Sequence, residues 1–258
     1  MRPAPESAAH ITVRGLSKTF GDAAVYERFD VDIARGEFVS VFGPNGCGKS
    51  TLINLIAGLI VPDGGEILFG GKTLATTKIG YVFQNYREAL FPWLTAWNNI
   101  EYPLKLMKLA PRERRARVER LVTRLGIKID LARYPYELSG GQQQLVSILR
   151  ALVVEPEVLF LDEPFSALDY EMTLFMREQL QRLFLETRTT TVLVSHDLEE
   201  AVYLADRVLL LTRRPARIAD DVPMPLTRPR SDETLSDADY VRLKGHCLEV
   251  FQREVRKA

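Results

Sequence analysis

The sequence is poor in cysteine and has no excess of charge of either sign. Only Cys47 and Cys247 occur among its 258 residues. Two cysteines cannot form a disulfide framework, which indicates a reducing compartment. Lysine plus arginine and aspartate plus glutamate each number 34, so the formal net charge is zero. Proteins dedicated to nucleic acid usually carry a basic excess. We therefore expect no nucleic-acid partner.

Long apolar segments are also missing. The richest apolar stretch, residues 52–61, contains Asn54 and is far too short to cross a bilayer. The first ten residues have no apolar core of the kind that secretory signals contain. No internal repeat is visible. We expect a chain that is soluble by itself, so any association with a membrane would come from a partner.

The hydrophobic pattern predicts an α/β protein. Ile11 and Val13, like Val31 and Ile33, alternate with polar residues, which predicts antiparallel strands near the start. Short apolar runs that predict buried, mostly parallel strands cover residues 38–42, 158–161, 191–194 and 208–211. A capping box formed by Asp197 and Glu200 is expected to open a helix that runs towards Ala205.

Residues from about 87 to 154 show helical patterns without strands. Val118, Leu121, Val122 and Leu125 form one apolar stripe that ends at Gly126. The opposite face is rich in arginine, either as an ordinary solvated face or as a contact for a partner or an acidic lipid. Beyond residue 220, a proline-rich and charged segment leads to a predicted terminal helix around residues 240–255.

A glycine-rich loop between the predicted strand at 38–42 and the helix after it matches the P-loop pattern G-x-x-x-x-G-K-[ST]. Its glycines let backbone amides approach phosphate oxygens, and Lys49 places a charge on the β and γ phosphates. The hydroxyl of Ser50 is placed to bind Mg²⁺. The candidate nucleotide-binding residues are Gly43, Pro44, Asn45, Gly46, Cys47, Gly48, Lys49, Ser50 and Thr51.

Two further segments extend the phosphate site. The predicted strand at 158–161 ends in Asp162 and Glu163, the first suited to hold Mg²⁺ and the second to polarise the attacking water. The segment Ser139, Gly140, Gly141 and Gln142 opens a predicted helix and forms a second anion site, or else a plain helix N-cap. Because one ATP needs only one such cradle from one protomer, we expect the second cradle to cap the γ-phosphate held by another copy.

Together these motifs resemble the ATP-binding-cassette (ABC) transporter ATPases, and the resemblance covers about residues 11–218. It implies a P-loop NTPase with a RecA-like parallel-sheet core, an N-terminal antiparallel β subdomain and an inserted α-helical subdomain. The implied cassette spans residues 1–220, the helical subdomain about 87–154, and a short helical tail 221–258. The implied cofactors are ATP and Mg²⁺.

The resemblance also assigns roles to single residues. It implies that Gln84 contacts Mg²⁺ and the water, that His196 contacts the γ-phosphate and orients Glu163, and that Asp169 meets the opposite P-loop. Phe20 resembles the aromatic residue that stacks on adenine, although it could also be a core residue at the end of a strand. The implied catalytic residues are Glu163, His196 and Gln84, and the implied metal site comprises Ser50, Gln84 and Asp162.

Within the family, residues 82–104, 196–211 and 212–218 look like importer subunits for nitrate, taurine and aliphatic sulfonates. This likeness implies a second cassette, identical or related, and permease subunits at the cytoplasmic face of the inner membrane. A periplasmic or lipid-anchored solute-binding protein would take part indirectly. The permease would contact four residues of the helical subdomain, or else these residues belong to the core of that subdomain. They are Phe91, Pro92, Trp93 and Leu94.

The family's signature motif corresponds to residues 138–142, and one departure from the family lies at its end. Many relatives carry Gln-Arg-Gln-Arg there, whereas this chain has Gln142, Gln143, Gln144 and Leu145. The alternative functions are a soluble ABC ATPase in translation or DNA maintenance, a cassette that binds ATP without hydrolysing it, and an importer for another solute class. The sequence has no Asn-Lys-x-Asp motif of the kind that reads guanine.

Overall fold

The computed structural model describes residues 9–256, except for the side chain of Arg87. Of the first ten residues, in which we expect no secretory signal, residues 1–8 lie outside the described part of the chain, as do residues 257–258 of the predicted tail. The chain divides into a first unit, residues 1–77 and 181–258, and a second unit, residues 78–180.

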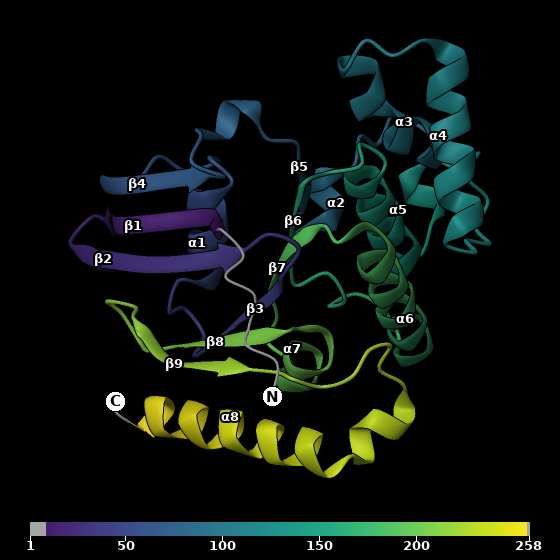
Figure 1. The fold of residues 1–258 in the computed structure, drawn as a ribbon. Helices are drawn as coiled ribbons and strands as arrows, with labels where there is room; N and C mark the ends of the chain where they lie inside the picture. Colours follow the sequence, from purple (N-terminus) through teal and green to yellow (C-terminus); the bar gives the residue numbers. More distant parts are fainter. Residues whose placement is uncertain (1–8, 257–258) are drawn as a thin grey trace. The chain divides into compact units, whose positions relative to one another are not determined.

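The first unit contains an antiparallel sheet of β1 (Ala9–Phe20), β2 (Ala23–Ala34) and β4 (Gly64–Phe69), in the order β2-β1-β4 (Figure 1). Ile11 pairs with Ile33 and Val13 with Val31. All four side chains are buried, which confirms the two strands predicted from alternation. The sequence pattern did not indicate β4, which begins with two glycines and buries only Phe69.

A second sheet in the first unit carries the P-loop. Its central strand β3 (Phe38–Phe42) is parallel to β7 (Thr190–Val194) on one side and to β8 (Arg207–Leu211) on the other. Helix α1 (Lys49–Ile56) follows β3, and α7 (Leu198–Leu204) follows β7. The carboxyl ends of β3, β7 and β8 therefore meet at one edge, where open α/β sheets place their ligands.

The last part of the chain differs from its prediction in one strand. β9 (Ile218–Pro223) pairs antiparallel with β8, where the sequence predicted only a charged, proline-rich segment. As an edge strand it buries only Val222, so it lacks a period-two apolar pattern. The terminal helix is confirmed as α8 (Ala238–Arg256), which contacts α7, β8 and β9 (Figure 1). Short 3₁₀ turns occupy Leu74–Thr76 and Asp232–Ser236.

The predicted capping box of α7 is wrong in one half. The Asp197 side chain does accept a hydrogen bond from the backbone amide of Glu199, as an N-cap should. Glu200 instead accepts a hydrogen bond from the Ser195 hydroxyl within the core. The box does not form because the Ser195 hydroxyl lies between the two groups: it donates to Glu200 and accepts from the Asp197 amide at 2.9 Å.

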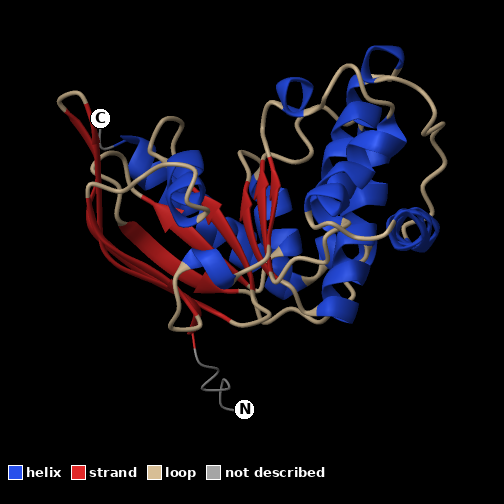
Figure 2. Cartoon of the chain, turned by 90° about the horizontal axis from the view of Figure 1, so that it is seen from above, coloured by secondary structure: helices blue, strands red, loops and turns tan. Residues whose placement is uncertain are grey.

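The second unit pairs β5 (Ile79–Val82) with β6 (Val158–Asp162) in parallel. Its helices gather in one cluster, in which α5 contacts α2, α3 and α4 (Figure 2). They are α2 (Tyr86–Ala89), α3 (Ala96–Leu106), α4 (Pro111–Arg124) and α5 (Gly140–Leu152), with a 3₁₀ turn at Pro135–Glu137. No strand lies between residues 87 and 154. Helix α6 (Tyr170–Thr187) begins in this unit.

The apolar stripe of α4 is confirmed. Val118, Leu121 and Leu125 are buried, and the helix ends before Gly126, which adopts a φ of 61°. On the arginine-rich face, Arg115 and Arg117 form i,i+4 ion pairs with glutamates of the same helix at 2.8 and 3.0 Å. Such pairs are typical of a solvated face. In the described part of the chain, no helix is long and apolar enough to cross a bilayer.

A buried arginine joins the segment before α8 to the helix after β7. The Nη1 atom of Arg230 donates hydrogen bonds to the carbonyl oxygens of Val202, Tyr203 and Ala205, at 3.1, 2.8 and 2.7 Å. Its Nη2 atom donates to Met224 O at 3.2 Å. Arg230 is 3% exposed. These donors satisfy carbonyl groups at the end of α7 that have no partner within the helix.

We expect Arg230→Met to lower the free energy of unfolding by about 3 kcal/mol, because buried carbonyl oxygens lose their donors. Chemical denaturation measures this change. Arg242→Met is the matched control, since Arg242 forms only an exposed ion pair with Asp239 on α8. We expect the control to change stability by less than about 0.5 kcal/mol. Equal losses in the two variants would contradict the capping role.

Candidate functional site

The P-loop of the first unit has the backbone that a phosphate cradle requires. Gly48 precedes α1 with a φ of 123°, which side-chain-bearing residues rarely adopt. A Cβ atom at Gly48 would lie 2.6 Å from Val25 Cγ1 on β2. The Tyr26 hydroxyl donates a hydrogen bond to the Gly48 carbonyl oxygen at 2.9 Å. Val25 and Tyr26 of β2 therefore support the P-loop at Gly48, a contact that the sequence did not reveal.

Lys49 brings a buried positive charge to this loop. Its Nζ atom donates hydrogen bonds to the carbonyl oxygens of Gly43 and Pro44 at 2.8 and 3.3 Å. The residue is 8% exposed. Among the described residues, no carboxylate forms an ion pair with Lys49. Because buried charges in proteins are normally paired, this ammonium group is arranged to receive an anion.

The other predicted site residues of the first unit follow β3 and β7 of the P-loop sheet or end β1 of the antiparallel sheet. Ser50 and Thr51 form the first turn of α1 and are half-buried. His196 is exposed and follows β7 by two residues. Phe20 ends β1 and is 48% exposed, so it is not a core residue. The Lys18 ammonium group lies 5.3 Å from the centre of its ring.

In the second unit, β6 carries the acidic pair at its carboxyl end. Asp162 is buried and Glu163 is half-buried. The Nε2 atom of Gln84 donates a hydrogen bond to Oε2 of Glu163 at 2.8 Å. The structure therefore brings together two of the three predicted catalytic residues. The Asp162 carboxylate also adds to the effect of burial in raising the pKa of Tyr81.

Gln144 holds the backbone next to this pair. Its Nε2 atom donates to the Glu163 carbonyl oxygen at 3.1 Å, and its Oε1 atom accepts from the Ala167 amide at 3.0 Å. Glu163 adopts a φ of 48°, an unusual value for a residue with a side chain. Gln144 is fully buried. A glutamine on the apolar face of a helix was the only sequence signal for this role.

Residues 139–142 of the signature motif form the N-terminal cap of helix α5. The Ser139 hydroxyl accepts a hydrogen bond from the Gln142 amide at 3.3 Å, and the Gln142 side chain accepts one from the Ser139 amide at 3.1 Å. This is the capping box of α5. The amides of Gly140 and Gly141 lie in the first turn, where a helix offers them no acceptor. The segment therefore has both the cap geometry and the donors of an anion site.

Asp169 caps the next helix. Its Oδ1 atom accepts from the Met172 amide at 2.8 Å, and its carbonyl oxygen accepts from the Thr173 amide. Asp169 is exposed, and the helix cap uses its Oδ1 atom. Its Oδ2 atom is therefore available to a partner.

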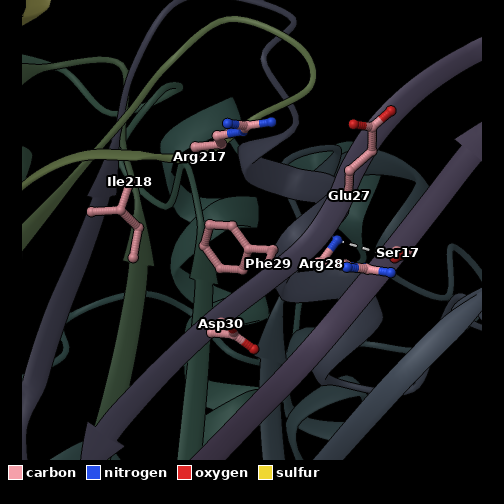
Figure 3. Close-up of a pocket in the computed structure, with 7 residues that line it drawn as sticks. All are labelled: Ser17, Glu27, Arg28, Phe29, Asp30, Arg217 and Ile218. Atoms are coloured by element: carbon pink, nitrogen blue, oxygen red, sulfur yellow. Dashed lines mark hydrogen bonds between the residues drawn. The ribbon is translucent and has the colours of Figure 1, made fainter.

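A hollow of about 700 Å³ in the first unit contains none of the predicted site residues. It lies beside β2 and β9 and is lined by Ser17, Glu27, Arg28, Phe29, Asp30, Arg217 and Ile218 (Figure 3). Its two arginines and two acidic residues give no excess of charge. This lining therefore lacks the unbalanced positive charge that Lys49 gives to the P-loop.

Comparison with known proteins identifies the family of the chain. A family model described as "ABC transporter" matches residues 26–166. The aliphatic sulfonates import ATP-binding protein of Rhodopseudomonas palustris is 41% identical over 95% of this chain and 84% of its own length. The bicarbonate transport ATP-binding protein of Synechocystis is 36% identical over 95% of this chain and 89% of its own length. A bacterial ABC transporter cassette solved as a dimer is 32% identical, with a TM-score of 0.75, over 84% of this chain and all of that one.

The fold and the site define a P-loop NTPase with an antiparallel N-terminal sheet and an inserted helical part. The chain belongs to the ABC transporter family. It is an ATPase of the transport type, and the predicted fold class and the family resemblance are confirmed.

Proposed function

We propose that the chain is the motor subunit of a membrane importer and that ATP closes two such cassettes around a shared pair of nucleotides. The buried Lys49 ammonium group, which has only carbonyl partners in the P-loop, carries this proposal. A triphosphate supplies the missing negative charge. Its γ-phosphate provides the differential contact that favours the closed dimer, and hydrolysis removes that contact.

The residues divide between binding and catalysis. Gly43 to Thr51 bind the phosphates, and Phe20 stacks on adenine. Glu163 polarises the attacking water, and the hydrogen bond from Gln84 supports the orientation of its carboxylate. His196 contacts the γ-phosphate. The reaction then rests on positioning and charge stabilisation, without a covalent intermediate.

The donor set fits Mg²⁺. Ser50, Gln84 and Asp162 offer hydroxyl, amide and carboxylate oxygens, which are the hard ligands that this ion prefers. The Asp162 side chain is 4% exposed, so a cation would offset the cost of its burial. When bound, Mg²⁺ neutralises charge that develops on the phosphate oxygens.

The second cassette, identical or related, contributes the other half of each site. Ser139 to Gln142 of one chain cap the γ-phosphate held by the P-loop of the other, and Asp169 meets that P-loop. The amides of Gly140 and Gly141 in the first turn of α5 support this arrangement, because a helix N-terminus favours an anion. A related bacterial cassette that forms a dimer has been solved.

The helical subdomain contacts the permease subunits. Trp93 is 70% exposed, which favours its contact with a partner. Phe91 is half-buried, and its ring lies 4.7 Å from that of Tyr102, so it also belongs to the core of the subdomain. The complex would lie at the cytoplasmic face of the inner membrane and work with a solute-binding protein.

We place the solute in the nitrate, taurine or sulfonate class, because the relatives include a sulfonate and a bicarbonate transport subunit. The relatives also include sulfate/thiosulfate and polyamine import subunits. Residues 1–220 form the cassette, about 87–154 its helical subdomain and 221–258 the tail. Transport assays with the reconstituted complex and each candidate solute test the class.

Ser139 provides the test of a site shared by two chains. We expect Ser139→Asp to abolish cooperativity in ATP concentration, because aspartate keeps the N-cap but repels the γ-phosphate. The Hill coefficient of ATP hydrolysis measures this effect, and it should fall to about one when the sites become independent. Thr95→Ala is the control, since Thr95 caps α3 in the same unit by the same kind of bond, at 3.3 Å.

Thr95→Ala should keep cooperativity despite losing about 1 kcal/mol of cap stability. Cooperativity retained by Ser139→Asp would show that each ATP is bound by one chain alone.

A further inference from the structure

The turn between β8 and β9 lies directly beside the P-loop. Strand β8 pairs with β3, with Leu210 opposite Phe42, so both strands end at the same edge of the sheet. A Cβ atom at Gly43 would lie 2.9 Å from the Leu211 carbonyl oxygen. The turn that starts at Thr212 therefore leaves the sheet next to the first glycine of the loop.

The other end of this turn is tied to the strand that braces the P-loop. The Ala216 amide donates a hydrogen bond to the Val25 carbonyl oxygen at 2.8 Å. Val25 and its neighbour Tyr26 are the residues that contact Gly48. Within the turn, the Thr212 hydroxyl accepts from the Arg217 amide at 3.0 Å. The turn is thus anchored at both ends against elements of the phosphate cradle.

Two adjacent arginines in this turn have different surroundings. The Nη2 atom of Arg213 donates to the Val255 carbonyl oxygen near the end of α8, at 3.0 Å. Arg214 is exposed, and no carboxylate among the described residues forms an ion pair with it. Arg213 is therefore bound to the C-terminal helix α8, whereas the charge of Arg214 is available to a ligand.

The charge of Arg214 reaches the P-loop. Burial raises the pKa of the Cys47 thiol, and the positive charges of Lys49 and Arg214 oppose that rise. Burial likewise raises the pKa of Tyr26, and Arg214 again acts in the opposite direction. The contacts of the turn with Gly43 and Val25 place Arg214 beside the P-loop, and its positive charge acts at Cys47 and at Tyr26, whose hydroxyl donates a hydrogen bond to Gly48.

The hydrogen bond that holds the turn to β2 also determines which part of a bound nucleotide lies next to Arg214. The turn is bonded to β2, whose neighbour β1 ends in Phe20, paired with Ala23. The turn is therefore on the adenine side of the P-loop if Phe20 stacks on the base. His196 follows β7, on the other side of β3. The phosphate nearest the adenine side is the α-phosphate.

We propose that Arg214 is a nucleotide-binding residue whose guanidinium group pairs with the α-phosphate of the nucleotide in the P-loop. This inference rests on the proposed function. Arginine suits the role because its planar fork can bind two phosphate oxygens at once. The contact is made to ATP and ADP alike, so it adds affinity for both nucleotides.

Arg214→Ala tests the inference, with Arg213→Ala as a control that removes the same charge one residue away. We expect Arg214→Ala to raise the Kd for ADP and the KM for ATP about tenfold, the loss of one hydrogen bond to a charged group. Arg214→Lys should recover part of the affinity, and Arg214→Gln little of it. Competition by inorganic tripolyphosphate should weaken in parallel, because the contact is to phosphate.

Three results would overturn the inference: unchanged Kd and KM in Arg214→Ala, an equal loss in Arg213→Ala, or a loss for ATP that tripolyphosphate does not share. In each case wild-type chain that binds and hydrolyses ATP leaves the proposed function intact. Wild-type chain that binds no ATP would remove the proposed function itself. Thermal melting without nucleotide shows whether each variant is folded.

Discussion

Glu163→Gln is expected to bind ATP with near wild-type affinity and to hydrolyse it about 10³-fold more slowly. The loss follows because an amide cannot take the proton of the attacking water, and positioned bases contribute about 10² to 10⁴-fold. The new amide oxygen can still accept the hydrogen bond that Gln84 now donates to Glu163. The hydrogen bond from Gln144 goes to the main-chain carbonyl of residue 163, so the backbone keeps its support.

The same variant should trap the dimer. If the γ-phosphate holds two cassettes together, a chain that cannot remove it should stay closed once ATP has bound. Size-exclusion chromatography with ATP and Mg²⁺ should show a dimer for Glu163→Gln and a shorter-lived one for wild type. A phosphate-release assay on the same samples gives the rate.

Glu171→Gln is the matched control, because Glu171 is an exposed acid in the first turn of α6. Its rate and its elution should match those of wild type. A Glu163→Gln chain that stays monomeric and still releases phosphate at the wild-type rate would remove Glu163 from the mechanism.

The sequence predicted the parts of this site whose chemistry is local. A P-loop needs its glycines, lysine and serine at fixed spacing between a strand and a helix, so residues 43–51 could be found from their order alone. Buried parallel strands such as β6 and β7 stand out as short apolar runs. Ser139 followed by Gln142 three residues later is likewise a local signal for a helix start.

Features that depend on distant partners could not be predicted. The sequence does not show that Gln144 reaches both Glu163 and Ala167, because those contacts join two loops to one helix. It does not show that Tyr26 supports Gly48 from a strand 22 residues earlier. Edge strands such as β9 bury too little surface to impose a pattern.

Lys49 is the residue whose loss should weaken nucleotide binding most. We expect Lys49→Ala to raise the Kd for ATP about 100-fold, because two hydrogen bonds between charged groups, to the β and γ phosphates, are lost. Affinity for ADP should fall less, because ADP lacks the γ-phosphate. Titration calorimetry with the two nucleotides measures both changes.

Removal of Lys49 has a second effect besides the loss of positive charge at the phosphates. Lys49 also donates hydrogen bonds to Gly43 and Pro44, so its removal loosens the loop as well as removing charge. Lys49→Met keeps the apolar stem without the ammonium group, and Lys72→Ala removes an exposed lysine from the same unit. Equal losses of ATP affinity in Lys49→Ala and Lys49→Met assign the effect to the ammonium group, with its charge and its hydrogen bonds, rather than to the apolar stem.

A loss in Lys49→Ala alone would assign the effect to the packing of the apolar stem, and unaltered affinity in both variants would remove Lys49 from the phosphate site. Lys72→Ala should bind as wild type does. The distinction matters because a buried ammonium group surrounded by carbonyl oxygens is costly in the absence of an anion. Lys49→Met removes this cost together with the donors of the Gly43 and Pro44 carbonyl groups, so thermal melting of the nucleotide-free chains shows which of the two contributions is larger.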